Sequence, residues 1–316
     1  MEISMVYFSN LDGDRTIMPF NTRLLEDSGR GMVYASNSLS GNSFYIRTPS
    51  NKPWYKADVS IVICTYGRPE SLNATLKSLT QQTFRDFEVL LITEKGNLSE
   101  LRQKGLVNSF GSIVSFIDDD VYCESTWIES IVKAFKKDSK VLGVTGPTTI
   151  TDEYRHNRDI FKYNIFREIH DRVFLGNKRF YPSHLSRCGT PSMASNDSEL
   201  NYAGRCDYLE ACNMSIKRKE ALDAGGFDPI YYRTSEWCEL DLAIKIGHKG
   251  TLLFVPEARL FHRPSVQGIY GARLRTAHRW DNFKSFQKRW VRPSFLRVLY
   301  WAWVWVYLKM KSYRMI

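Results

Sequence analysis

The chain has 316 residues, enough for one large α/β domain with additions or for two small domains. Hydrophobic residues make up 43% of the chain and charged residues 25%, which permits a sizeable core and excludes wholesale disorder. The formal net charge of +10 favours an anionic partner. Charge alone does not distinguish among a nucleotide, a nucleic acid and an acidic membrane surface.

The chain carries no recognisable export, zinc-binding or membrane-spanning signal. Its six cysteines form no Cys-x-x-Cys pair, which argues against a structural zinc site. The first residues, MEISMVYFSNLDGD, lack a basic start followed by an apolar core, so we expect a cytoplasmic protein with reduced thiols. No apolar run reaches the roughly 20 residues that a membrane-spanning helix needs.

Residues 1–56 are rich in Ser, Asn and Gly without a clear period, and we treat them as an N-terminal extension. From Val59 onward, short β-branched runs alternate with helical patterns. Strands are predicted at 60–66, 87–93, 112–118 and 141–146, and helices at 70–82, 98–110 and 125–138. This alternation predicts an α/β fold whose mostly parallel central sheet of Rossmann-like βαβ units carries helices on both faces.

The second half of the chain continues the same domain, which we place at residues 57–265. A polar excursion over the active face is expected at 151–200. It is followed by a strand pattern at 205–217, helices at 218–228 and 237–250, and two strand pieces within 251–262. In such sheets ligands bind beyond the carboxyl ends of the strands, so functional residues should follow the strand runs.

Residues 266–316 form a predicted basic and aromatic helical region. The apolar run VLYWAWVWVYL at 298–308 has Lys and Arg on both sides, and no Asp or Glu follows Asp281. Trp and Tyr beside Lys and Arg suit a lipid headgroup boundary, here the inner face of the cell membrane. A terminal helix packed on the domain or on a second subunit explains the pattern equally well.

Three consecutive carboxylates, Asp118, Asp119 and Asp120, directly follow the third predicted strand. Like charges so close together resist ionisation unless something compensates them, and a divalent cation such as Mg²⁺ or Mn²⁺ can do so. The alternative interpretation is a solvated acidic turn that binds no ligand, and the position of the aspartates at a strand end disfavours it. The chain has neither a P-loop nor a Gly-x-Gly-x-x-Gly segment after the first strand, which argues against P-loop enzymes and dinucleotide oxidoreductases.

Five segments, VSIVICTYGRP, FEVLLIT, FIDDDV, YLEACNMSIKRKEALDAGGFD and CELDLAIKIGHKG, occur in this order within about residues 58–262. Together they resemble the family 2 glycosyltransferases of GT-A fold. The resemblance implies an inverting, hexosyltransferase-like enzyme that uses Mn²⁺ or Mg²⁺. The implied donor is a UDP- or GDP-linked sugar, and the implied acceptor is a glycan or a lipid-linked acceptor in polysaccharide, glycolipid or glycoprotein assembly.

The same resemblance implies roles for individual residues. The nucleotide contacts would be Thr65, Tyr66, Arg68, Glu94, Asp118 and Asp119. The metal ligands would be Asp118, Asp120 and His262. Glu239 takes the position of the general base, with Glu236 as its rival, and the sugar contacts would be Trp237, Asp241 and Asn213.

The chain departs from the family pattern at the predicted base. The usual Glu-Asp pair reads Cys238-Glu239, which leaves open a degenerate protein that binds a nucleotide-sugar or glycan without turnover. The Gln-x-x-Arg-Trp motif of processive synthases is missing, which favours transfer of one or a few sugars. No nucleic-acid-binding motif accompanies the basic charge, so we do not expect a nucleic-acid partner.

Overall fold

The computed structural model describes residues 6–9, 15–18, 33–35, 43–47, 57–150, 165–192, 202–264 and 277–312. Much of the expected excursion at 151–200 lies outside these residues. Within them, β1 (Val6–Ser9) and β2 (Arg15–Met18) form an antiparallel pair separate from the main sheet.

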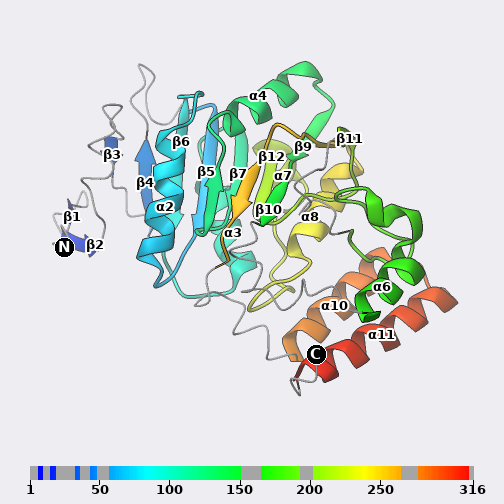
Figure 1. Ribbon diagram of the computed structural model, residues 1–316. Helices are drawn as coiled ribbons and strands as arrows, with labels where there is room; N and C mark the ends of the chain where they lie inside the picture. Colours follow the sequence, from blue (N-terminus) through cyan, green and yellow to red (C-terminus); the bar gives the residue numbers. More distant parts are fainter. Residues whose placement is uncertain are drawn as a thin grey trace.

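The centre of the molecule is a nine-stranded sheet, counted over the described residues, in the order β11-β13-β9-β12-β7-β5-β6-β4-β3 (Figure 1). Strand β5 pairs in parallel with both β6 and β7, and β9 pairs in parallel with β13. Strand β12 lies between β7 and β9 and is antiparallel to both. The strands are β3 (Val33–Ala35), β4 (Ser43–Arg47), β5 (Val59–Cys64), β6 (Phe87–Ile92), β7 (Ile113–Ile117), β9 (Val141–Thr145), β11 (Gly204–Arg205), β12 (Asn213–Lys217) and β13 (Thr251–Phe254).

The helices alternate with these strands as the hydrophobic pattern predicts. The succession β5-α2-β6-α3-β7 makes two βαβ units, which confirms the predicted α/β class. The helices of the domain are α2 (Pro69–Thr80), α3 (Leu98–Asn108), α4 (Trp127–Lys137), α7 (Arg218–Asp223) and α8 (Cys238–Gly247).

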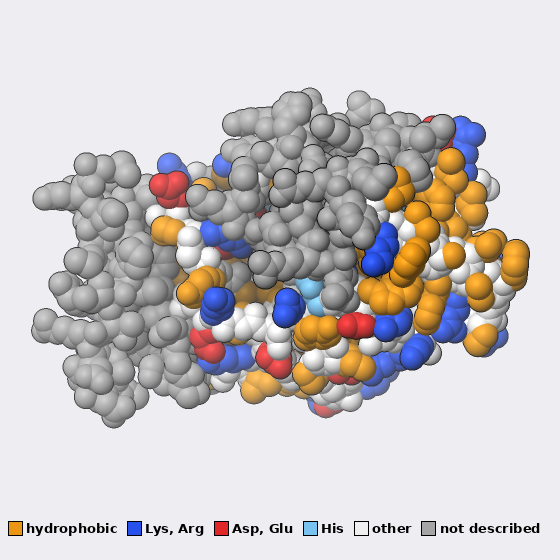
Figure 2. All heavy atoms as spheres, turned by 90° about the horizontal axis from the view of Figure 1, so that it is seen from below, with side chains coloured by type: hydrophobic (Ala, Val, Ile, Leu, Met, Phe, Trp, Pro, Cys, Tyr) orange, Lys and Arg blue, Asp and Glu red, His pale blue; other side chains and the backbone are white. Residues whose placement is uncertain are grey.

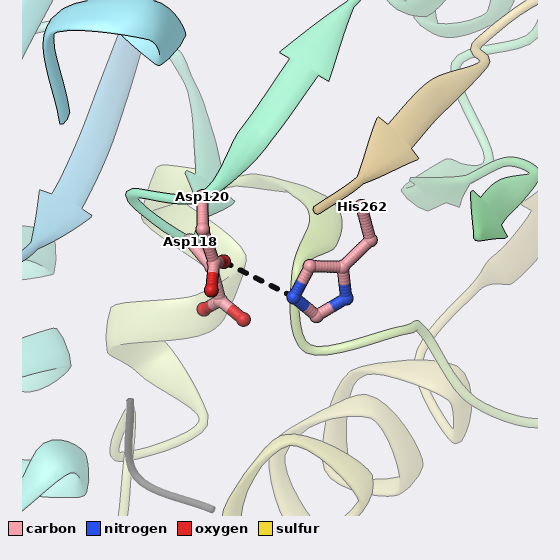
Figure 3. A group of neighbouring side chains, drawn as sticks. All are labelled: Asp118, Asp120 and His262. Atoms are coloured by element: carbon pink, nitrogen blue, oxygen red, sulfur yellow. Dashed lines mark ion pairs between the residues drawn. The ribbon is translucent and has the colours of Figure 1, made fainter. Parts of the chain in front are cut away.

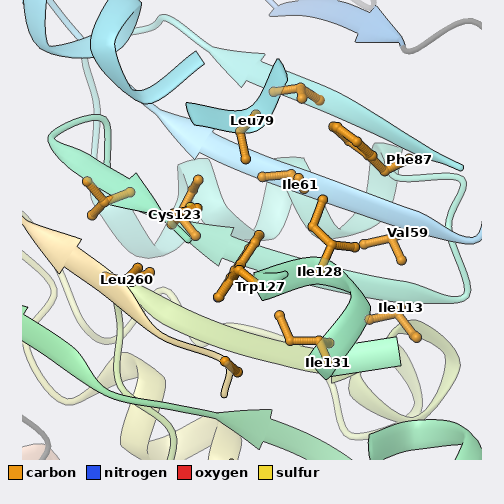
Figure 4. Packing of buried hydrophobic residues seen from close by; sticks show 14 of the residues in the cluster. Val59, Ile61, Leu79, Phe87, Ile113, Cys123, Trp127, Ile128, Ile131 and Leu260 are labelled. Atoms are coloured by element: carbon orange, nitrogen blue, oxygen red, sulfur yellow. The ribbon is translucent and has the colours of Figure 1, made fainter. Parts of the chain in front are cut away.

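Helices cover both faces of the sheet because the strands are apolar on both sides. Val59, Ile61 and Ile63 of β5 pack in one hydrophobic cluster with residues of α2 and α4, including Trp127 (Figure 4). Val62 points to the opposite face and joins the cluster that α3, α7 and α8 complete. Successive side chains of a strand alternate between faces, so continuous apolar strands of this kind need two helical layers.

Helix α3 lies unusually close to the sheet. A Cβ atom on Gly105 would come within 2.3 Å of the Val62 Cγ1 atom, so a residue larger than glycine would push α3 away from β5. This close approach carries the buried side chain of Arg102 to the carboxyl ends of the strands.

Two smaller sets of strands accompany the centre of the sheet, one at its edge and one as a separate sheet. Strands β4 and β3 add to its edge beside β6, so part of the region up to residue 56 joins the sheet, and the domain boundary at 56/57 stays a prediction. A separate three-stranded sheet, in the order β10-β14-β8, stands beside it. Its strands are β8 (Val121–Cys123), β10 (Thr148–Ile150) and β14 (Leu260–His262).

The C-terminal region is helical. Helices α10 (Ala277–Trp290) and α11 (Phe295–Ser312) lie together with α6 (Ile165–His170) at one end of the molecule (Figure 1). Trp301 of α11 contacts Trp280 and Phe283 of α10 with ring centroids 5.9 Å apart in each case. Among the helices that the structure describes, none combines the length and apolar character that crossing a membrane requires.

Candidate active site

The three aspartates occupy the short connection between β7, which ends at Ile117, and β8, which begins at Val121. Strand β8 turns away from the main sheet and pairs with β14, whose His262 lies opposite Val121 in the register. The Arg263 backbone N–H donates to the Asp120 carbonyl oxygen at 2.8 Å. The pairing of β8 with β14 therefore brings together an acidic turn and a histidine more than 140 residues apart.

Asp118, Asp120 and His262 form a group that could hold a metal ion. Their candidate ligand atoms all lie within 4.8 Å of one another, and His262 Nε2 is 3.1 Å from Asp120 Oδ1 (Figure 3). Asp120 and His262 are buried, whereas the Asp118 side chain is 36% exposed. Two carboxylates and one imidazole suit a divalent ion such as Mn²⁺, and the exposed side leaves room for a substrate ligand.

Arg68 and Thr65, at the end of β5, compensate the acidic turn in part. The Arg68 guanidinium lies 2.5 Å from Asp119 Oδ1 and 3.3 Å from Asp120 Oδ2, and the Thr65 hydroxyl donates to Asp119. Burial nevertheless raises the pKa of Asp119 to about 7. Arg68 and Thr65 lower this pKa, whereas repulsion from Asp120 and Asp118 raises it further. A bound cation would favour the ionised form of this carboxyl.

The other predicted nucleotide contacts lie on the same edge of the sheet. Tyr66 is 62% exposed just beyond β5. Glu94, two residues after β6, forms an ion pair with Lys104 of α3. The structure thus gathers Thr65 and Arg68 at the aspartates themselves and leaves Tyr66 open to a ligand.

Arg102 links the acidic turn to the predicted base, and the sequence interpretation missed it. Its Nη2 atom is 3.7 Å from Asp118 Oδ1, and its Nη1 atom is 4.0 Å from Glu239 Oε2 and 3.6 Å from Cys238 Sγ. Burial lowers the pKa of Arg102, but Cys238, Asp118 and Glu239 raise it by more, so the guanidinium stays charged. A signal was present, because Arg102 lies on the same buried face of α3 as Gly105 and Leu106.

The two candidate bases lie in different surroundings. Glu239, in the first turn of α8, has a 16% exposed side chain and faces Asp118 across Arg102. Glu236 is held by the Arg279 guanidinium at 3.1 Å and accepts from the Thr234 hydroxyl, which also contacts His278 Nε2 at 2.8 Å. Glu236 is therefore tied to α10, whereas Glu239 adjoins the acidic turn.

The segment that leads into α8 is strained. Arg233, Ser235 and Trp237 all have positive φ angles, of 59°, 51° and 70°. Non-glycine residues adopt this region rarely, and such strain clusters at functional sites. Trp237 is half-buried, and its ring lies 5.6 Å from that of Phe283 on α10.

Asn213 and Asp241, which the resemblance assigns to sugar contact, are both bonded to protein groups in the interior. Both are fully buried. The Asn213 amide accepts from Trp127 Nε1 and donates to two backbone carbonyls, whereas Asp241 accepts from Tyr231, Arg289 and Trp290 and pairs with Lys245. Protein groups already engage both side chains, and their contact with a sugar stays a prediction.

The family model of glycosyl transferase family 2 matches residues 92–193, a stretch that contains Arg102 and the whole acidic turn. This part of the chain is similar to the family 2 glycosyltransferases, which supports a glycosyltransferase role. The glucosyl-dolichyl phosphate glucuronosyltransferase of Haloferax volcanii is 25% identical over 265 residues, covering 72% of this chain and 74% of that protein. The cholesterol galactosyltransferase of Borreliella burgdorferi is 28% identical over 111 residues, and the match covers 27% of this chain and 31% of that protein.

Solved glycosyltransferase structures resemble the chain more distantly. GalNAc-T7 with UDP, GalNAc and Mn²⁺ superposes with a TM-score of 0.46 at 14% identity, over 71% of this chain and 46% of that one. Residues 1–349 of TarS from S. aureus give a TM-score of 0.43 at 11% identity, over 65% and 60% of the two chains. The chain therefore spans less than two thirds of either structure.

Proposed function

We propose that this glycosyltransferase uses a divalent cation at Asp118, Asp120 and His262 to transfer a sugar, with inversion, from a UDP- or GDP-linked donor to an acceptor hydroxyl. One observation supports this most strongly. Three potential metal ligands, two from the connection between β7 and β8 and one from β14, converge within 4.8 Å, and a candidate base, Glu239, faces them across a single arginine.

The chain's own residues would hold the donor. Arg68 orients Asp119 and Asp120 through its two ion pairs, and Thr65 fixes Asp119 from the end of β5. Tyr66 and Glu94, at the same edge of the sheet, would contact the nucleoside. A cation bound at this position, for which Mn²⁺ suits the ligand set better than Mg²⁺, would stabilise the charge of the leaving diphosphate.

Glu239 would act as the general base. The acceptor oxygen bonds to the anomeric carbon while the bond from that carbon to the diphosphate breaks, and the hydroxyl proton passes to the Glu239 carboxylate. This single displacement inverts the anomeric centre and needs no second carboxylate nucleophile, unlike retaining hydrolysis. Arg102 would position Glu239 relative to Asp118.

We further propose a lipid-linked acceptor, encountered at the inner face of a membrane. The two related proteins are named for lipid substrates, dolichyl phosphate in one and cholesterol in the other. The half-buried Trp237 beside Glu239 offers an aromatic wall for an acceptor sugar.

The test is thermal stabilisation by a panel of UDP- and GDP-sugars, with and without Mn²⁺. We expect the wild-type protein to be stabilised by one donor class only when Mn²⁺ is present, and Asp120→Ala to lose that effect. Asp223→Ala, at an exposed aspartate on α7, is the matched control and should behave as wild type. Equal stabilisation of Asp120→Ala would contradict the metal role, and binding without transfer to any acceptor would favour the degenerate alternative.

A further inference from the structure

The outer face of α11 is an exposed apolar stripe. Its side chains recur at spacings of three and four residues, which places them on one side of the helix over a length of about 17 Å. The large apolar residues of the stripe, with the exposed fraction of each, are Phe295 (79%), Val298 (65%), Leu299 (42%), Trp305 (50%) and Val306 (44%). Ala302 fills the gap between them and is exposed as well.

The opposite face of α11 is apolar too, and the protein covers it. Tyr300 and Leu308 are each 5% exposed, and the Tyr300 ring lies 5.0 Å from that of Phe174. A helix that packs only on its own domain needs one apolar face, with polar groups on the other. The second apolar face of α11 therefore calls for a partner outside the chain.

The surface around the stripe is also apolar and basic. Ile169 and Val173, in the segment that contacts α11 through Phe174, are 41% and 52% exposed. Figure 2 shows hydrophobic side chains gathered together with Lys and Arg at the end of the molecule where Figure 1 places α10 and α11. Monomeric soluble proteins rarely expose large contiguous apolar patches, and those that do use them for binding.

Cations stand at both ends of the stripe. Arg292 is exposed just before α11. The Lys309 ammonium lies 5.7 Å from the centre of the Trp305 ring at the other end, and no acidic residue follows Asp281 in the sequence. Anionic headgroups above an apolar layer complement this arrangement, whereas a second copy would bring two basic surfaces together.

We infer that the outer face of α11 docks on the surface of an anionic bilayer, with the helix lying in the plane of the interface. Its apolar stripe enters the boundary between headgroups and acyl chains, and Arg292 and Lys309 remain at headgroup level. This inference rests on the exposed stripe and its charges, and it holds whatever sugar the enzyme transfers.

Docking at α11 would also set the position of the active site. The Trp301 indole N–H donates to Gln287 Oε1 of α10 at 3.1 Å, and at the start of α10 His278 contacts Thr234. Thr234 belongs to the strained segment that leads into α8 and Glu239. Helix α10 thus contacts both the docking helix and the segment that leads to the candidate base, so a lipid-anchored acceptor would reach the site from the surface on which the protein sits.

The test is co-sedimentation of the full chain with phosphatidylcholine vesicles, with and without phosphatidylglycerol. We expect the triple variant Val298→Gln/Leu299→Gln/Trp305→Gln to lower partition to anionic vesicles about tenfold or more, because three apolar side chains no longer enter the bilayer. The matched control, Val107→Gln/Ile230→Gln, changes residues that are 49% and 47% exposed elsewhere and should partition as wild type. The single variant Val298→Gln serves if the triple variant unfolds.

A second pair of variants separates charge from apolar contact. Arg292→Glu/Lys309→Glu should weaken binding to phosphatidylglycerol-containing vesicles about tenfold and leave binding to neutral vesicles unchanged. Lys77→Glu/Lys133→Glu, at exposed lysines on α2 and α4, is the control. Unchanged partition of the stripe variants would overturn the inference. The inference would also be overturned if light scattering showed that the wild type is a dimer and the triple variant a monomer, while both bound vesicles equally.

Discussion

Two regions of this glycosyltransferase bury carboxylates, and they do so in different ways. At the junction of α8 and α10, Asp241 accepts from Tyr231, Arg289 and Trp290 through one oxygen and pairs with Lys245 through the other. At the end of β7, three adjacent carboxylates share two arginines, one threonine and one histidine, and Asp118 is open to solvent.

The difference separates a supporting carboxylate from one that is suited to a ligand. The charge of Asp241 is matched by protein donors, which makes its cluster a fixed joint between two helices. At the acidic turn, burial still raises the pKa of Asp119 to about 7 despite its partners, so the protein alone does not fully stabilise the charges. A bound cation would complete the second region and has no role in the first.

The largest expected effect of a single change is on Glu239. Glu239→Gln keeps the shape of the side chain but removes its ability to accept a proton, so kcat should fall about 10²- to 10⁴-fold with little change in KM for the donor. Steady-state transfer assays at saturating Mn²⁺ measure this. Glu236→Gln, at the rival carboxylate held by Arg279, should lower kcat much less, and the reverse ranking would move the base to Glu236.

The contrasting prediction concerns Asp241. Asp241→Asn removes a buried charge, leaves Lys245 without its ionic partner and leaves Arg289 paired with Asp228 alone, which should lower the free energy of unfolding by about 3 kcal/mol. Urea denaturation measures the loss. Transfer activity per folded molecule should stay near wild type. A large fall in kcat without loss of stability would instead support the predicted sugar contact of Asp241.

The fold was largely predictable because the strands from β5 to β9 are continuous β-branched runs separated by amphipathic helices. The antiparallel direction of β12 was not predictable, since a strand pattern carries no information about its neighbours. The burial of Asp241 has a geometric reason that the sequence pattern alone did not reveal. Two residues along a helix turn a side chain by about 200°, so Asp241 points away from the face that Glu239 occupies.

A smaller effect is expected at Asn213, another buried side chain with several protein partners. Asn213→Ala leaves the Trp127 indole N–H and two backbone carbonyls without partners in a buried position, which should lower the free energy of unfolding by about 1–3 kcal/mol. Thermal unfolding followed by near-ultraviolet circular dichroism would detect it. A stability equal to wild type would show that water replaces these bonds.

The smallest effect is expected at a surface ion pair. Lys133 and Glu129 lie one helical turn apart on α4 at 2.8 Å, and the lysine side chain is 73% exposed. Lys133→Ala should change the free energy of unfolding by no more than about 0.5 kcal/mol, because solvent screens the pair. A loss as large as that of Asp241→Asn would show that burial does not govern how much these charges matter.

The most direct test of the acidic turn is Mn²⁺ binding in the presence of UDP, followed by the electron paramagnetic resonance signal of the free ion. We expect one tightly bound Mn²⁺ per wild-type chain, weak or no binding in Asp120→Asn, and wild-type binding in the folded fraction of Asp241→Asn. Equal Mn²⁺ affinity in the wild type and Asp120→Asn would contradict this expectation.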